Sequence, residues 1–183
     1  MHPDQPKRLL RRFFAGLTEY AFQTRLGVAD PALIDYLSDM LVRFVRCDKV
    51  YRLRDLTGRP LIEVAEMSVE SEARVGDARR EAHRHIGDFI LFWTGVYPEA
   101  LRRMRGPQSK DQFVDYCAQG KRSYHIASTI AVDKGDESEK ATKDVLERLS
   151  GEFELCMHGL SEVRREWERR DDEGRGPISL LIT

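Results

Sequence analysis

The sequence predicts an all-α protein, built as a single-domain bundle of five or six helices with a long, heptad-patterned C-terminal helix and a short apolar C-terminal tail. Apolar residues recur at helical spacing along most of the 183 residues, and only two short stretches resemble strands. Glycine, proline and capping residues separate the helical stretches. The length suits one domain. We expect the bundle to span residues 1–173, followed by a hinge and docking tail at 174–183.

The first third of the chain predicts two helices. The first spans Lys7–Leu26, and Gly27 follows at the position where a left-handed cap ends a helix. Asp30-Pro31 then caps and starts a second helix, which extends to about Arg46. Residues 48–58 fit either a continued helix or a short strand, and the pattern does not decide between them.

The middle of the chain predicts two further helices. Pro60 is well placed to begin the first, and Gly76-Asp77 marks either its end or a glycine tolerated within one very long helix. The second is expected from about Asp77 to Arg105, where Gly106-Pro107 ends it. Residues 86–96 are apolar around most of the helix, which indicates a central helix packed on several sides.

The last part of the chain predicts two more helices. A capping box at Ser109-Lys110-Asp111-Gln112 opens the first. Its expected core face is Phe113, Tyr116, Cys117, Gly120, Tyr124 and Ala127. After the loop VDKGDESEK, apolar residues alternate in steps of three and four at Leu146, Leu149, Phe153, Cys156, Leu160, Val163 and Trp167. Such a heptad seam is typical of coiled coils, and it predicts a homodimer through this helix or its neighbours.

Composition bounds the function. The formal net charge is −1 and 33% of residues are charged, so global charge gives no support to nucleic-acid binding. No apolar run reaches the roughly 18 residues of a membrane span, because Asp88 interrupts the longest one. The N-terminal stretch lacks the pattern of a secretory signal, and three widely spaced cysteines form no paired motif. A cytoplasmic, reducing location is expected, and the 23 arginines against 7 lysines suggest a bacterial source.

Glu81, His85 and Asp88 form the main candidate site, because they share one face of the central helix. A histidine oriented by a carboxylate beside apolar residues suits general-base catalysis or metal binding, and His125 or Tyr124 of the next helix could join it. The alternative is a core network in which Asp88 accepts hydrogen bonds from His85 and from an arginine. We favour this structural interpretation, because buried polar groups are usually satisfied rather than catalytic.

Metal chemistry finds little support in the spacing. The di-iron type of helical bundle needs a glutamate three residues before a histidine, and no histidine here has one. The zinc-protease pair is also absent. Glu154, His158 and Glu162 share a helix face, but His158 falls on the side most remote from the heptad seam. We interpret that trio as solvated, and the sequence predicts no metal site and identifies no cofactor.

Two charged surfaces and the tail complete the candidates. Lys121, Arg122 and His125 form a basic strip that is expected to be solvated. Lys7, Arg8, Arg11 and Arg12 stand in the first turns of a helix, where the macrodipole disfavours cations, so Arg8, Arg11 and Arg12 are weak candidates for anion binding. In the tail, Ile178, Leu180, Leu181 and Ile182 should dock on the same chain, on a second copy or on a partner protein.

Together these patterns favour a protein with an interaction or structural role that associates with itself. The alternative is a metal- or cofactor-binding enzyme centred on Glu81, His85 and Asp88. The sequence alone does not decide whether the protein is an enzyme.

Overall fold

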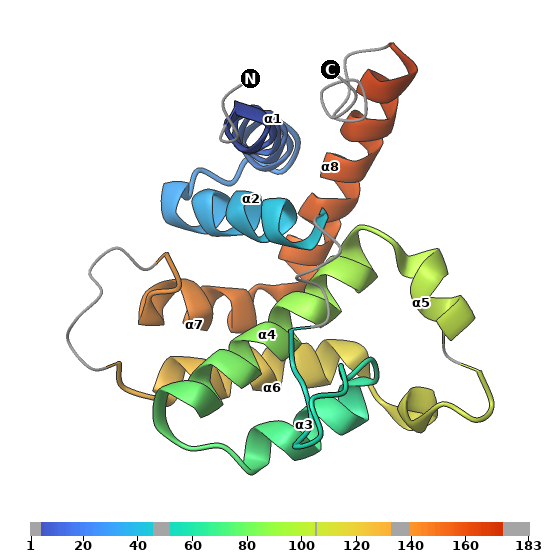
Figure 1. Ribbon diagram of the computed structural model, residues 1–183. Coiled ribbons are helices and arrows are strands. Elements are labelled where there is room, and N and C mark those ends of the chain that lie inside the picture. Colours follow the sequence, from blue (N-terminus) through green and yellow to red (C-terminus); the bar gives the residue numbers. More distant parts are fainter. Residues whose placement is uncertain (1–4, 46–51, 105, 133–139, 174–183) are drawn as a thin grey trace.

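The structure is a computed structural model, and it describes residues 5–45, 52–104, 106–132 and 140–173 (Figure 1). These residues form eight α-helices and no strand. The α-helices are α1 (Gln5–Glu19), α2 (Pro31–Val45), α3 (Val64–Glu72), α4 (Gly76–Gly95), α5 (Pro98–Met104), α6 (Tyr116–Thr129), α7 (Lys143–Gly151) and α8 (Phe153–Asp172). The all-α prediction is confirmed, but the eight helices exceed the five or six expected.

Helix α4 occupies the centre of the fold. It packs against α2, α3, α5, α6 and α8, while α1 lies over α2 at one end of the molecule (Figure 1). The buried apolar residues form one continuous core that extends from Leu10 to Val163. The expectation of a central helix packed on several sides is therefore correct for α4.

Capping residues mark the end of the first helical stretch and the start of the second, as the sequence predicts. After α1, the chain continues as a π-helix (Tyr20–Arg25), and Gly27 follows with a φ of 68°, a left-handed conformation that glycine adopts without strain. The Asp30 side chain accepts a hydrogen bond of 3.2 Å from the backbone N–H of Leu33 at the start of α2. Phe22 fixes the π-helix to α8, because its ring lies where a side chain on Gly159 would stand.

Residues 52–63 form neither a helix nor a strand. They make a tight turn with one isolated bridge between Arg54 and Pro60. The rest of the undecided segment, residues 48–51, lies outside the described residues. Farther along, Gly76 has a φ of 55°, so the chain turns there and α3 and α4 are separate helices.

Two helices expected to be continuous are divided. The helix predicted over 77–105 ends at Gly95, and Pro98 begins α5, because proline lacks the N–H that a continued helix needs. The helix predicted from Ser109 is a 3-10 turn (Lys110–Phe113), and α6 starts later, capped by Asp115. The reason is that the Asp111 carboxylate instead accepts the backbone N–H groups of Val64 and Ala65 at the start of α3, each at 2.8 Å.

The long C-terminal helix is also two helices. The chain breaks at Glu152, where φ is −111° and ψ is 31°, next to the flexible Gly151. The seam residues still face one core, because α7 and α8 pack on the same interior. All are at most 1% exposed except Trp167, which is half-buried and meets Phe14 edge to face at 5.2 Å. The seam is therefore filled by this chain itself, and it offers no open face to a second copy.

Within the described ranges, no helix is both long and apolar enough to cross a membrane.

Candidate functional site

The carboxylate of Asp88 is the centre of a buried polar cluster that joins three helices. One oxygen, Oδ1, accepts hydrogen bonds from the hydroxyls of Tyr36 on α2, at 2.5 Å, and Tyr124 on α6, at 2.8 Å. The other, Oδ2, accepts one from the Arg43 guanidinium on α2 at 3.1 Å. Asp88 is fully buried. We call these four residues the Asp88 centre.

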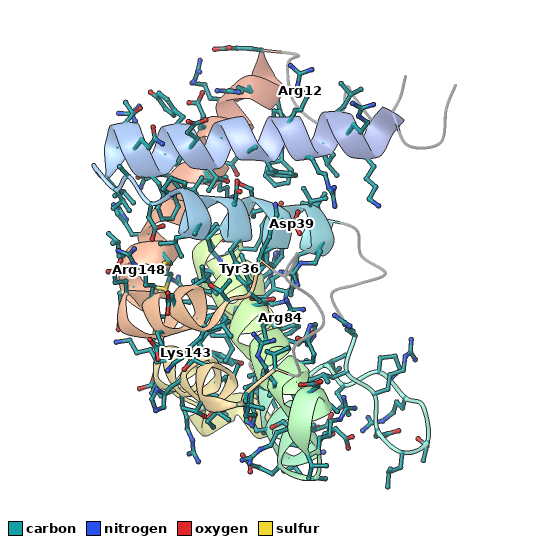
Figure 2. The ribbon with its side chains drawn as sticks, turned by 90° about the vertical axis from the view of Figure 1, so that its left-hand side faces the viewer. Arg12, Tyr36, Asp39, Arg84, Lys143 and Arg148 are labelled. Atoms are coloured by element: carbon teal, nitrogen blue, oxygen red, sulfur yellow. The ribbon has the colours of Figure 1, made fainter. Side chains whose placement is uncertain are left out.

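The local sequence explains how the three helices come close enough. Gly87 precedes Asp88 on α4, and the Tyr124 ring lies against its backbone. A Cβ at position 87 would lie 2.8 Å from that ring, closer than real contacts allow. Tyr36 and Arg84 lie near the boundary of α2 and α4 (Figure 2). The glycine therefore sets the position of the Tyr124 hydroxyl.

The electrostatics of the centre keep both tyrosines protonated. Burial raises the pKa of Tyr36 and of Tyr124 well above 10, and the negative charge of Asp88 raises both further. Each hydroxyl therefore donates to the carboxylate, while Arg43 supplies a positive charge. Hydrogen bonds to a charged group are among the stronger ones in proteins. The centre is well suited to hold α2, α4 and α6 together.

His85 stands next to this centre without bonding to it. Its ring stacks on Phe44, with centroids 5.9 Å apart, and burial lowers its pKa to about 4 against the opposing charge of Asp88. Its Nε2 atom is buried and has no hydrogen-bond partner. Asp88 receives its hydrogen bonds from Tyr36, Tyr124 and Arg43, so the expected pair of His85 with Asp88 does not form.

The structure separates the remaining candidates. Glu81 is partly exposed, at 33% of its side chain, and pairs with Arg84 at 2.6 Å and with Arg52 at 3.8 Å. His125 is exposed, whereas its neighbour Tyr124 is fully buried. The fold thus brings Asp88 and Tyr124 into contact and leaves Glu81 and His125 outside the centre.

Sequence reasoning missed Tyr36 and Arg43. They stand two turns apart on α2, so helical spacing places them on one face. The pattern gave no sign that this polar pair meets α4.

The described part of the chain holds no group of three or more His, Cys, Asp or Glu side chains arranged to bind a metal. Glu154 pairs with Lys121 and Glu162 with Arg165, while His158 is exposed. Glu154 and His158 are thus exposed, as the expected solvated cluster requires, whereas the Glu162 side chain is only 16% exposed.

The N-terminal cations lie on the surface of α1. Arg11 approaches Asp39 at 4.0 Å, and Arg8 and Arg12 are exposed. Figure 2 shows Arg12 on the side of α1 away from α2. Anion binding by Arg8, Arg11 and Arg12 stays a prediction. So does docking of the tail, because Ile178, Leu180, Leu181 and Ile182 lie outside the described residues.

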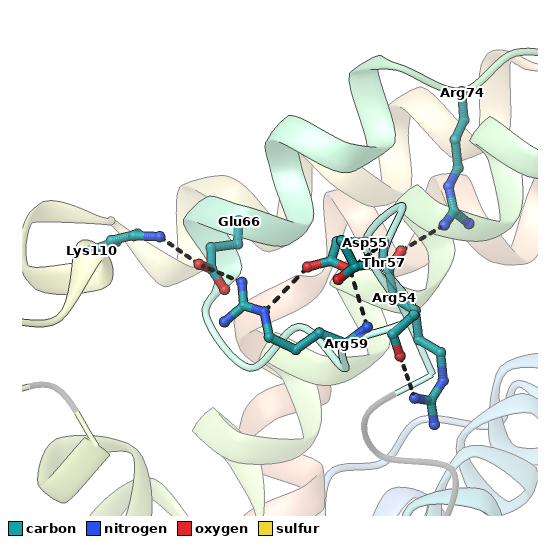
Figure 3. A network of polar contacts seen from close by, with 8 residues as sticks. Arg54, Asp55, Thr57, Arg59, Glu66, Arg74 and Lys110 are labelled. Atoms are coloured by element: carbon teal, nitrogen blue, oxygen red, sulfur yellow. Dashed lines mark hydrogen bonds and ion pairs between the residues drawn. The ribbon is translucent and has the colours of Figure 1, made fainter.

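A second candidate site is the turn between α2 and α3. Oδ1 of Asp55 accepts hydrogen bonds from the Thr57 backbone at 2.8 Å, the Thr57 hydroxyl at 2.6 Å and the Arg59 backbone at 3.0 Å (Figure 3). These bonds, with that of the Thr57 hydroxyl first, lower the pKa of Asp55 to about 2. These bonds hold the turn, and at its tip Leu56 is 100% exposed.

A hollow of about 320 Å³ lies beside this turn. Its lining residues are Asp55, Arg59, Leu61, Ala65, Glu66, Val69, Glu70 and Lys110. Ion pairs fix its wall, because Glu66 binds both Arg59, at 3.3 Å, and Lys110, at 2.5 Å (Figure 3). Val69 and Ile62 are 75% and 58% exposed. We call Leu56, Ile62 and Val69, with this hollow, the turn surface.

No protein-family model, curated protein or solved structure matches this chain. Function is therefore inferred from the chemistry of the two sites.

Proposed function

We propose that the protein is a self-associating interaction protein and that two copies meet through the turn surface. The observation that supports this most directly is the full exposure of Leu56 at the tip of a turn held by hydrogen bonds. Burying a leucine side chain yields about 1.5–3 kcal/mol. A turn already held by hydrogen bonds loses little conformational freedom when it binds, so more of that gain is kept as affinity.

The charges of the turn surface suit a second copy as the partner. Asp55 and Glu70 are acidic, whereas Arg59 and Lys110 are basic, and all four line one hollow. In a dimer with a two-fold axis, the same patch of each copy meets. If the patch carries acidic and basic side chains, the acidic groups of one copy can lie against the basic groups of the other. The net charge of −1 adds little repulsion between copies.

The alternative of a metal or cofactor site around Glu81, His85 and Asp88 has less support. Both oxygens of Asp88 already accept hydrogen bonds, and the residue is fully buried. Glu81 is engaged by arginines at the surface. The Asp88 centre is better explained as a structural contact that orients α2, α4 and α6.

The test is the molar mass of the protein in solution, measured by sedimentation equilibrium over a concentration series. We expect the wild type to reach the mass of a dimer and Leu56→Asp to remain a monomer with an unchanged thermal melt. Leu9→Asp is the matched control, since Leu9 is exposed on α1, away from the turn. A wild type that stays monomeric throughout, or a Leu56→Asp dimer of equal strength, would contradict the proposal.

A further inference from the structure

A second group of polar side chains, separate from the Asp88 centre, lies where α4 begins. His83 is 1% exposed, and neither Nδ1 nor Nε2 has a hydrogen-bond partner. Arg79, one turn earlier on α4, also has a buried Nε without a partner. Buried polar atoms are rarely left unpaired, and an ion or ligand that belongs at the site is one explanation of such atoms.

Glu72, the last residue of α3, covers this group only in part. Its Oε2 accepts a hydrogen bond of 2.8 Å from Nη2 of Arg79, and its Oε1 lies 3.6 Å from Nε2 of His83. The second distance is too long for a hydrogen bond. The Glu72 side chain is 53% exposed, so its carboxylate can turn into water.

Arg122 stands on α6, which packs against α4, and it supplies a second positive charge that acts on His83. It is exposed and has no ion-pair partner among the described residues. Burial lowers the pKa of His83, the charge of Glu72 raises it, and those of Arg79 and Arg122 lower it again. At pH 7, His83 is therefore neutral and offers one N–H donor. When the Glu72 side chain turns away, the guanidinium groups of Arg79 and Arg122 and the neutral ring N–H of His83 remain. The two positive charges balance the two negative charges of a phosphate dianion.

We propose that Arg79, His83 and Arg122 form a binding site for a phosphate dianion, and that the Glu72 carboxylate takes its place when the site is empty. Nε of Arg79, a ring N–H of His83 and the Arg122 guanidinium each donate to one phosphate oxygen. The ligand is free phosphate or the phosphate group of a small phosphomonoester, which share this chemistry. The site does not depend on self-association.

The test is isothermal titration calorimetry with inorganic phosphate at constant ionic strength, using the full chain. Arg79→Gln and Arg122→Gln should each weaken binding about tenfold or more, because each removes a charged donor. Glu72→Gln should strengthen it several-fold, because the competing carboxylate is lost. Arg102→Gln, an exposed arginine on α5, is the matched control and should leave affinity unchanged.

Nuclear magnetic resonance of the His83 ring gives a second readout. A bound dianion favours the protonated ring, so saturating phosphate should raise the pKa of His83, and Arg102→Gln should show the same rise. Glycerol phosphate distinguishes the two sources: tighter binding than inorganic phosphate indicates a phosphomonoester, and equal binding indicates free phosphate. The proposal is overturned if neither probe binds saturably, or if Glu72→Gln and Arg79→Gln bind phosphate as the wild type does.

Discussion

Two carboxylates in this protein, Asp88 and Asp55, each accept several hydrogen bonds. One positions whole helices in the core, and the other positions a short turn at the surface. Asp88 binds side chains from two other helices, at residues far away in sequence, and is fully buried. Asp55 binds groups only two to four residues away and fixes a turn at the surface. The first contact assembles the core, and the second holds Leu56 in water. A hydrogen-bonded carboxylate thus stabilises the core in one region, whereas in the other it holds an apolar side chain exposed to water.

The largest expected effect is that of Asp88→Ala. Removing the carboxylate leaves Arg43 and two tyrosine hydroxyls without their acceptor, and breaking a buried charged contact costs about 3–5 kcal/mol. Urea unfolding should show a loss of that size. His125→Ala, at an exposed position, should unfold like the wild type. An Asp88→Ala protein of undiminished stability would show that the centre does not hold the helices together.

Acid should destabilise the protein through His85. Folding depresses the pKa of His85 from 6.5 to about 4, so the unfolded chain takes up the proton first. The stability is therefore complete above pH 6.5 and falls as the pH drops to about 4, by roughly 3 kcal/mol at 1.36 kcal/mol per pH unit. Urea unfolding at pH 7 and pH 4 measures this loss. His85→Phe should reduce it, and an equal loss in that variant would assign the acid sensitivity to other groups.

Two glycine substitutions should act in opposite directions. Gly87→Ala places a Cβ against the Tyr124 ring and should cost about 1–3 kcal/mol, the usual penalty of overpacking. Gly16→Ala meets no atom within 4 Å on α1 and should stabilise by about 0.5–1 kcal/mol through helix propensity. Thermal melts of both variants check this pair. The close approach of α4 and α6 would be in doubt if Gly87→Ala were neutral.

Asp55→Ala removes the acceptor of the three hydrogen bonds that hold the turn. It should have the smallest effect on stability, because this turn is exposed and contributes little to the core. The looser turn should nevertheless weaken self-association, since Leu56 would lose its fixed position. Melting and sedimentation of the same sample separate the two effects. A variant with a lower melting temperature but unchanged self-association would show that Asp55 serves stability and not the turn surface.

Local signals in the sequence predicted much of the fold. Gly27 and Asp30 end and start helices as expected, since capping depends on neighbouring residues alone. The breaks at Glu152 and Pro98 were not expected. The heptad pattern indicates which residues are buried, but it does not show that they belong to one continuous helix. Helices α7 and α8 are separate, and both bury their seam residues in the same core.

The candidate sites were harder to predict, because they depend on which helices meet. Spacing placed Asp88 on an inner face of its helix but could not show that Tyr36 and Arg43 approach from α2. The turn surface was missed for a different reason. An apolar residue such as Leu56 is expected to be buried, so only a structure reveals that it is exposed.

The most direct test of the central claim is a methyl spectrum recorded by nuclear magnetic resonance over a concentration series of the wild type. If the exposed apolar residues of the turn are the binding surface, the methyl signals of Leu56, Ile62 and Val69 should shift together as the concentration rises, while those of core residues such as Leu37 stay constant. Signals that do not depend on concentration, or shifts confined to Leu9 or Val132, would contradict the account.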